Sequence, residues 1–181
     1  SAAFDQQLVV ALGDRLRELP ARLGLKQHLL CGVSQVAVGA DTVFSLALQA
    51  LQWPQRVLLP QRADDYLRAG HHEQADFSPA EQAVARALLA APHVIERRVV
   101  SDAEDRSARF EDTNLAIARE SDVVVCLLRA GARARPGGTH DLMQQAMRAG
   151  KPVWTLEVTL RDGRPVLSPW MAGPRNASAT S

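Results

Sequence analysis

The apolar positions of the chain follow two patterns, a helical spacing and short continuous runs. Over residues 5–23 they recur every three or four residues, which predicts an amphipathic helix that Pro20 bends or ends. A strand over Leu8–Leu12 with a turn at Gly13 is the alternative, but the helix behind it would be short, so we favour one long helix. Its apolar face would comprise Leu8, Ala11, Leu12, Leu16 and Leu19.

Short apolar runs predict the β-strands, and helical spacing predicts a helix after most of them. Strands that alternate with helices in this way form a parallel sheet with right-handed crossovers. The predicted fold class is therefore α/β, a Rossmann-like three-layer sandwich with a mainly parallel sheet. The run at 122–128 is apolar throughout, so we expect a central strand there, covered on both faces. The predicted strands are 28–33, 56–59, a short strand within 93–100, 122–128 and 152–158. The predicted helices are 39–51, 78–91 and 105–120, and a loop and helix are predicted over 137–150.

Local turn and cap signals sharpen this outline. Ser78-Pro79-Ala80-Glu81 combines a serine N-cap, a proline at the first helical position and a glutamate that closes a capping box. Asp162-Gly163 is a hairpin turn signal and predicts a C-terminal β-hairpin. Residues 61–76 are polar without an apolar period, which predicts a loop or lid. We expect one domain over residues 1–170 and a disordered tail over 171–181.

Composition narrows the class of protein. The 21 Lys plus Arg and 20 Asp plus Glu give a net charge of +1, so no general field attracts nucleic acid or anionic lipid. No apolar run approaches the roughly 20 residues of a membrane span, and no basic stripe interleaved with aromatic residues predicts nucleic-acid binding. Cys31 and Cys126 lie in apolar runs, and no signal peptide is recognised ahead of them. We therefore expect buried thiols in a cytoplasmic protein.

Two glycine-marked turns leave predicted strands and enter predicted helices, and we expect Gly32 to end a strand and Gly39 to open a helix. In an open parallel sheet such turns border the ligand crevice, and free N–H groups at a helix start bind anions. Either turn could be only a tight connection, but two on one edge of a sheet favour a shared crevice for a phosphate-bearing ligand. The first turn offers Gly32, Ser34, Gly39, Ala40 and Asp41, and the second offers Gly137, Gly138, Thr139 and His140.

Charged residues near the turns add candidates. Arg129, Arg133 and Arg135 flank the second turn, where a guanidinium can bind a phosphate bidentately, although solvated loop arginines fit equally well. Arg62 follows another strand end and could cover the base or ribose from the opposite side. His71-His72-Glu73 is a weak metal signal, because adjacent histidines point apart and no third ligand is suitably spaced. We expect neither a metal nor a cofactor.

The turns and several flanking residues resemble the SLOG superfamily, which includes DprA-like and LOG-like Rossmann proteins. The resemblance implies a nucleotide-binding Rossmann-like fold with Pro60 and Asn114 near the ligand. Family members include phosphoribohydrolases and modules that sense nucleotide-derived signals, such as those in bacterial immune effectors and TRPM channels. The resemblance spans roughly residues 5–158 and rests on Gly32–Asp41, Leu59-Pro60, Asn114, Ser121-Asp122 and Gly137-Gly138-Thr139, in this order.

One departure bears on the choice between these activities. LOG-like hydrolases carry PGGxGTxxE, whose glutamate takes part in breaking an N-glycosidic bond, whereas here Thr139 follows the glycine pair directly and Leu142 stands three residues later. Asp141 or Glu111 could supply a carboxylate instead, with His140 assisting. The simpler interpretation is that Asp141 is a first-turn acid favoured by the helix dipole and that Glu111 is a charge on a solvated helix face.

The sequence therefore predicts a sensor or regulatory module, such as part of an antiviral effector, that binds a nucleotide or nucleotide-derived second messenger. The expected ligands are of the ADP-ribose-like or cyclic nucleotide class, and we expect a homo-oligomer or a fused effector domain. A nucleotide N-glycosidic-bond hydrolase is the first alternative. An interaction or oligomerisation domain with a vestigial site is the second.

Overall fold

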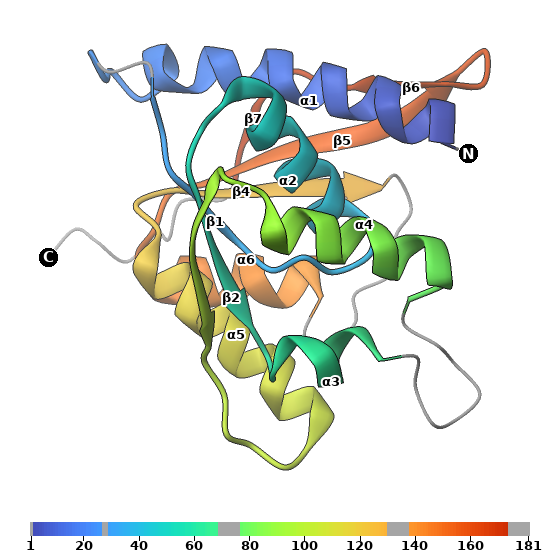
Figure 1. Ribbon diagram of the computed structural model, residues 1–181. Coiled ribbons are helices and arrows are strands. Elements are labelled where there is room, and N and C mark those ends of the chain that lie inside the picture. The colour runs from blue at the N-terminus through green and yellow to red at the C-terminus, as the bar shows by residue number, and fades with distance from the viewer. Residues whose placement is uncertain (1, 27–28, 69–76, 130–137, 174–181) are drawn as a thin grey trace, which may run out of the picture. The chain divides into compact units, whose positions relative to one another are not determined.

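The computed structural model describes residues 2–26, 29–68, 77–129 and 138–173. The chain has an α/β fold and divides into two compact units, Ser1–Val99 and Val100–Ser181, each with its own β-sheet (Figure 1). The two units are described in turn. The single domain expected from the sequence stays a prediction.

The first unit holds a three-stranded parallel sheet in the order β1-β2-β3, alternating with helices. α1 packs against α2, and α2 follows the first strand (Figure 1). This arrangement agrees with the predicted alternation of strands and helices. The elements are α1 (Ala2–Arg22), β1 (Gly32–Ser34), α2 (Ala40–Leu51), β2 (Gln55–Leu59), α3 (Ala63–Leu67), α4 (Pro79–Ala90) and β3 (Val94–Val99).

The second unit holds a mixed sheet. β4 and β5 are parallel, whereas β6 and β7 each pair with β5 in the antiparallel sense. The two helices of this unit pack against one another. The elements are α5 (Arg106–Glu120), β4 (Val124–Arg129), α6 (Thr139–Arg148), β5 (Val153–Arg161), β6 (Arg164–Leu167) and β7 (Met171–Ala172).

The prediction of one mainly parallel sheet is wrong, because the described strands form two sheets. The prediction of a central strand at 122–128 is also wrong. β4 stands at the end of the order β4-β5-β6, and its side chains alternate between buried and partly buried before the exposed Arg129. An apolar run predicts that a strand exists, but it does not name the neighbours to which the strand will hydrogen-bond.

The predicted amphipathic helix is confirmed as α1, and the alternative strand over Leu8–Leu12 is wrong. Pro20 lies inside the helix and does not end it before Arg22. Pro20 lacks the N–H that would donate to the Leu16 carbonyl, and the helix continues for only two residues beyond it. The helix buries four leucines at the predicted spacing, which are Leu8, Leu12, Leu16 and Leu19.

The predicted capping box is confirmed at the start of α4. The backbone N–H of Ser78 donates to Glu81 Oε2 at 2.7 Å, and the Glu81 N–H donates to Ser78 Oγ at 3.3 Å. Pro79 occupies the first helical position, as expected. Two of the otherwise open N–H groups of this helix are therefore satisfied by its own sequence.

The predicted C-terminal hairpin is confirmed as β5 and β6, with Arg161 opposite Arg164. Asp162 and Gly163 both have positive φ angles, 51° and 74°, as a two-residue hairpin turn requires. The start of the expected disordered tail is different: Met171–Ala172 forms β7 against β5, because a sheet edge can pair with a short segment of almost any composition.

A short helix, α3, lies within the segment predicted to be a loop or lid. Its Tyr66 and Leu67 are buried, and the Tyr66 ring meets Phe77 edge-on at 5.3 Å between centroids. Two aspartates in its first turn suit a helix start. The apolar pair is too short to show a period, so the sequence pattern missed this helix.

The cysteines fall into different environments. Cys126 is buried, as predicted, and burial raises the pKa of its thiol to about 12. Cys31 is exposed, which contradicts the prediction of a buried thiol. The predicted strand began at residue 28, whereas β1 begins at Gly32, directly after Cys31, so Cys31 stays outside the sheet.

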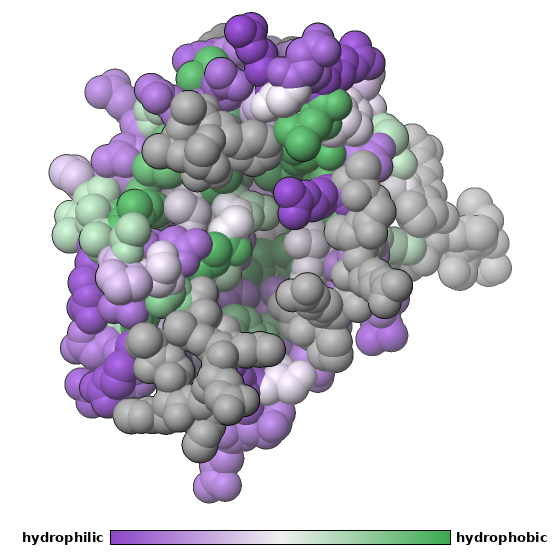
Figure 2. Space-filling view, turned by 90° about the vertical axis from the view of Figure 1, so that its right-hand side faces the viewer, coloured by the Kyte–Doolittle hydropathy of each residue, from purple (hydrophilic) through white to green (hydrophobic). Residues whose placement is uncertain are grey.

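The exposed large hydrophobic side chains are spread over different elements. Val10 on α1, Ile95 on β3 and Leu160 on β5 are each about three-fifths exposed. On the face in Figure 2, hydrophobic side chains are interspersed with hydrophilic ones. Isolated exposed apolar residues of this kind are normal in folded proteins. Among the described residues, no helix is long and apolar enough to cross a membrane.

Gly32 is required by packing, so we expect Gly32→Ala to lower the free energy of unfolding by about 1–3 kcal/mol. A Cβ at this position would lie 2.2 Å from Leu48 Cδ1 and 3.1 Å from the Phe44 ring, and Leu48 is itself fully buried. Chemical denaturation measures the change. In the matched control, Gly13→Ala on α1, the new Cβ meets no atom within 4 Å, and the protein should gain roughly 0.5–1 kcal/mol of helix stability. Equal effects of the two substitutions would contradict this account.

Candidate functional site

The carboxyl ends of β1, β2 and β3 lie on one edge of the first unit's sheet, because all three strands are parallel. Ser34 aligns with Val57 on β2, and Leu59 aligns with Val99 on β3. The turn over residues 35–39 therefore leaves the same edge as Pro60 and Arg62. This is the edge at which open α/β sheets bind ligands.

Gly39 opens α2, as predicted, with φ of 102° and ψ of −121°. Only glycine adopts this conformation without strain. No side chain caps the helix. The Thr42 N–H and hydroxyl both donate to the Ala37 carbonyl, at 3.2 and 2.8 Å. Within the described part of the chain, the N–H groups of this first turn that remain open are those of Ala40 and Asp41. Open N–H groups at a helix start are groups of the kind that bind anions in other α/β proteins.

Asp41 is the second residue of α2 and has an unusual carboxyl group. Burial raises its pKa from the usual 3.8 to about 6, and a hydrogen bond with the Ala37 backbone opposes this rise. A carboxyl group with such a pKa changes its charge within the range of cellular pH. Strongly perturbed acids of this kind gather at functional sites, although structural networks produce them too.

Gly32 and Ser34, the other candidates of the first turn, serve the scaffold. Gly32 begins β1 instead of ending it, and it admits the α2 side chains described above. The Ser34 hydroxyl donates to the Gln35 carbonyl at 2.7 Å and accepts from Gln55 Nε2 at 2.9 Å. With these bonds directed inward, Ser34 holds the start of the turn.

Gln55 is the centre of a buried polar network that the sequence did not predict. Its side chain is fully buried, and Nε2 donates to Ser34 and, at 2.8 Å, to Ser45 on α2. Its Oε1 lies 3.1 Å from His93 Nε2. Since Oε1 can only accept, Nε2 of His93 carries the proton in this pairing. The one available signal was a glutamine two residues before the apolar run that starts at Val57, and this signal is not specific.

His93 completes the network from the residue before β3. Burial lowers the pKa of its imidazole. Its Nδ1 is buried and has no hydrogen-bond partner among the described residues. A hydrogen bond with the Ser45 backbone opposes this lowering of the pKa, but burial is the larger effect and favours the neutral ring.

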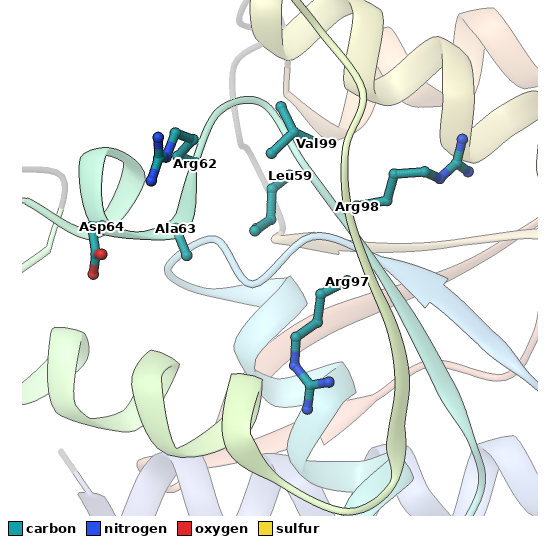
Figure 3. Close-up of a pocket in the computed structure, with 7 residues that line it drawn as sticks. All are labelled: Leu59, Arg62, Ala63, Asp64, Arg97, Arg98 and Val99. Carbon is teal, nitrogen blue, oxygen red and sulfur yellow. The ribbon is translucent and has the colours of Figure 1, made fainter.

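An open pocket of about 340 Å³ lies at the carboxyl ends of β2 and β3 (Figure 3). Leu59 and Val99 form its centre, and Arg62, Ala63 and Asp64 of the α3 start form one side. Pro60 is buried beneath this turn, and Arg62 is exposed. Their places agree with a site at the end of β2.

The arginines of this pocket do not converge. Arg97 and Arg98 are neighbours on β3 and point to opposite sides (Figure 3). Arg97 Nε donates to the Leu89 carbonyl, and Arg98 Nε donates to Glu96 Oε1 at 3.0 Å. The pocket is therefore positively charged at its rim, but it is not an arginine clamp around one phosphate.

In the second unit, α6 also starts at a glycine without a side-chain cap. Gly138 is the N-cap, with φ of −90° and ψ of −171°, an extended conformation open to any residue. Thr139, His140 and Asp141 follow in the first turn and are partly buried. Arg129 is exposed at the end of β4. A glycine that its backbone conformation does not demand leaves space for a neighbouring group.

Asn114 fixes this helix start. Its side chain is 3 % exposed, and Nδ2 donates to Asp141 Oδ2 at 2.9 Å and to the Gly138 carbonyl at 3.4 Å. The resemblance placed Asn114 near the ligand. The structure places it beside the helix start, with both of its N–H groups directed to the protein.

The three candidate catalytic residues have different surroundings. Asp141 is held by Asn114, whereas Glu111 is exposed on α5 and accepts from Ser107 on the same helix at 3.4 Å. His140 occupies the first turn of α6. Glu111 is thus on a solvated helix face, as the simpler interpretation expected.

Several sequence candidates lie outside the described residues. These are Gly137, Arg133, Arg135 and the His71-His72-Glu73 group. Within the described residues, no cluster of three or more His, Cys, Asp or Glu side chains could hold a metal ion. The expectation that both glycine turns line one crevice stays a prediction.

Comparisons with protein-family models, with curated proteins and with solved structures find no match.

Proposed function

We propose that the protein binds a nucleotide or a nucleotide-derived second messenger and acts as a sensor or regulatory module of Rossmann-like, SLOG-type architecture. The proposal rests on the two helices that follow the glycine turns. α2 and α6 each start at a glycine without a side-chain cap. α4 and α5, in contrast, are capped by Ser78 and Asp105. Open N–H groups at a helix start are the groups that bind phosphate in many α/β proteins.

An aspartate in the first turn of each uncapped helix supports recognition of a ligand that carries hydrogen-bond donors as well as a negative charge. Asp41 and Asp141 stand in the first turns of α2 and α6. A phosphate favours the N–H groups, whereas a carboxyl group selects hydroxyl or amine donors. A nucleotide carries both kinds of group. Inorganic phosphate carries only one.

Titration calorimetry tests this function with mononucleotides, NAD, ADP-ribose and cyclic oligonucleotides as probes. We expect one class to bind, and Gly138→Val to weaken that binding by about tenfold or more, because a branched side chain occupies the space beside the open N–H groups. The melting temperature should change little, since valine tolerates the extended backbone of this position. Gly13→Ala on α1 is the control and should bind as the parent does.

The contrary results are clear. If none of the nucleotide probes bound, the result would favour an interaction domain with a vestigial site. Unchanged binding by Gly138→Val would remove α6 from the site.

Hydrolysis of an N-glycosidic bond is the second candidate, because Asn114 holds the Asp141 carboxylate in a fixed place. Release of free base, followed by chromatography and lost in Asp141→Asn, would support it. No release at high protein concentration would exclude it.

A further inference from the structure

Asn114 joins α5 to the start of α6 through a matched set of hydrogen bonds. An asparagine amide nitrogen has two hydrogens. Asn114 directs them to Asp141 Oδ2 at 2.9 Å and to the Gly138 carbonyl at 3.4 Å. Because the side chain is 3 % exposed, solvent does not compete for these donors. The position of the Asp141 carboxylate is therefore set by a group on another helix.

This partner does not neutralise the carboxylate. Asn114 is an amide, and no ion pair of Asp141 is found among the described residues. The positive end of the α6 dipole stabilises the charge but leaves it in place. A phosphate suits the open N–H groups of this turn and would be repelled by direct contact with the carboxylate, whereas a hydroxyl donor would gain a charge-assisted hydrogen bond to it.

We propose that Asn114 is a positioning residue, and that it holds Asp141 to accept the hydroxyl groups of the ligand's sugar. The inference rests on the proposed function and specifies it: the α6 start selects ribose over sugars that lack hydroxyls. Asn114 touches no ligand in this arrangement. It acts through the angle and place of the Asp141 carboxylate and through the Gly138 carbonyl.

The test compares ribonucleotides with analogues that lack the hydroxyls. Calorimetry uses AMP, GMP, CMP and UMP together with their 2′,3′-dideoxy counterparts. We expect the parent protein to prefer the ribonucleotide of a bound pair by about tenfold, the usual weight of a hydrogen bond to a charged group. Asp141→Asn and Asn114→Leu should each remove most of this preference. Their effects should not add in the double variant, because both remove one interaction.

Two controls keep a structural role apart from a positioning role. Arg148→Gln alters the last turn of α6, far along the helix from its start, and should keep the preference. Asn114→Leu is also followed by its melting temperature, because loss of a buried amide can destabilise the unit. The dideoxy counterpart supplies the internal reference, since it should bind Asn114→Leu and the parent equally.

Each contrary result has a separate meaning. If Asn114→Leu weakened the binding of ribonucleotides and of their dideoxy counterparts equally, Asn114 would have only a structural role, and the inference would be overturned. Nucleotide binding by the parent without any preference for hydroxyls would overturn it as well, while the proposed function would stand. If none of the nucleotides bound, the proposed function would fail and the inference with it.

Discussion

Gln55→Leu is expected to lower the free energy of unfolding by on the order of 3 kcal/mol. The leucine fills a similar volume but leaves Ser34, Ser45 and His93 without the partner that serves all of them. Each buried polar group that loses its partner costs about 1–3 kcal/mol, and part of the loss is recovered by burying apolar atoms. Urea denaturation at neutral pH, followed by circular dichroism, measures the change.

Gln49→Leu is the matched control for this substitution. Gln49 lies on α2 and is exposed, so the same chemical change there should shift stability by less than about 0.5 kcal/mol. A similar small effect at Gln55 would mean that the network contributes nothing and that the turn after β1 is held in another way.

Asp41→Asn is expected to stabilise the protein at pH 7.5 by up to about 3 kcal/mol. Burial raises the pKa of the Asp41 carboxyl from 3.8 to about 6, so the folded state binds its proton more tightly than the unfolded state does. Stability from this group is therefore full below pH 3.8 and is lost as the pH rises through about 6. Asparagine resembles the protonated form and removes that loss.

The pH dependence separates this effect from a general gain in packing. Urea denaturation of both proteins at pH 4 and at pH 7.5 should show little difference at the lower pH and the full difference at the higher one. A constant difference at both values would contradict the assignment to Asp41. A gain at pH 7.5 would also show that the Asp41 carboxyl group costs the fold stability, as functional groups commonly do.

Features decided by neighbours in the sequence could be predicted well. The capping box at Ser78 and the Asp162-Gly163 turn depend on a few adjacent residues, and both formed as expected. The leucine spacing of α1 was equally reliable, because burial of one helix face repeats every turn. The division of the strands into two sheets could not be read in this way. It depends on hydrogen bonds between segments far apart in the sequence, and all apolar runs look alike in this respect.

The candidate site shows the same limit. Gly39 and Gly138 could be found from the sequence, since a glycine between a strand and a helix is a local signal. The pairing of Asn114 with Asp141 spans 27 positions, and no local sequence signal near either residue predicts it. Gln55 was missed for a similar reason, because its partners come from β1, α2 and the residue before β3. Ser34 could be named as a candidate, but only the structure shows that its hydroxyl faces the protein.

The central claim is that the open helix start of each unit, α2 in the first and α6 in the second, is a nucleotide-binding feature, and amide chemical shifts test it most directly. A titration of the isotopically labelled protein with the tightest nucleotide of the calorimetry panel reports on each backbone N–H. The account predicts the largest shifts at Ala40, Asp41, Thr139 and His140. Shifts of equal size at the capped starts of α4 and α5, or no shift at either glycine turn, would contradict it.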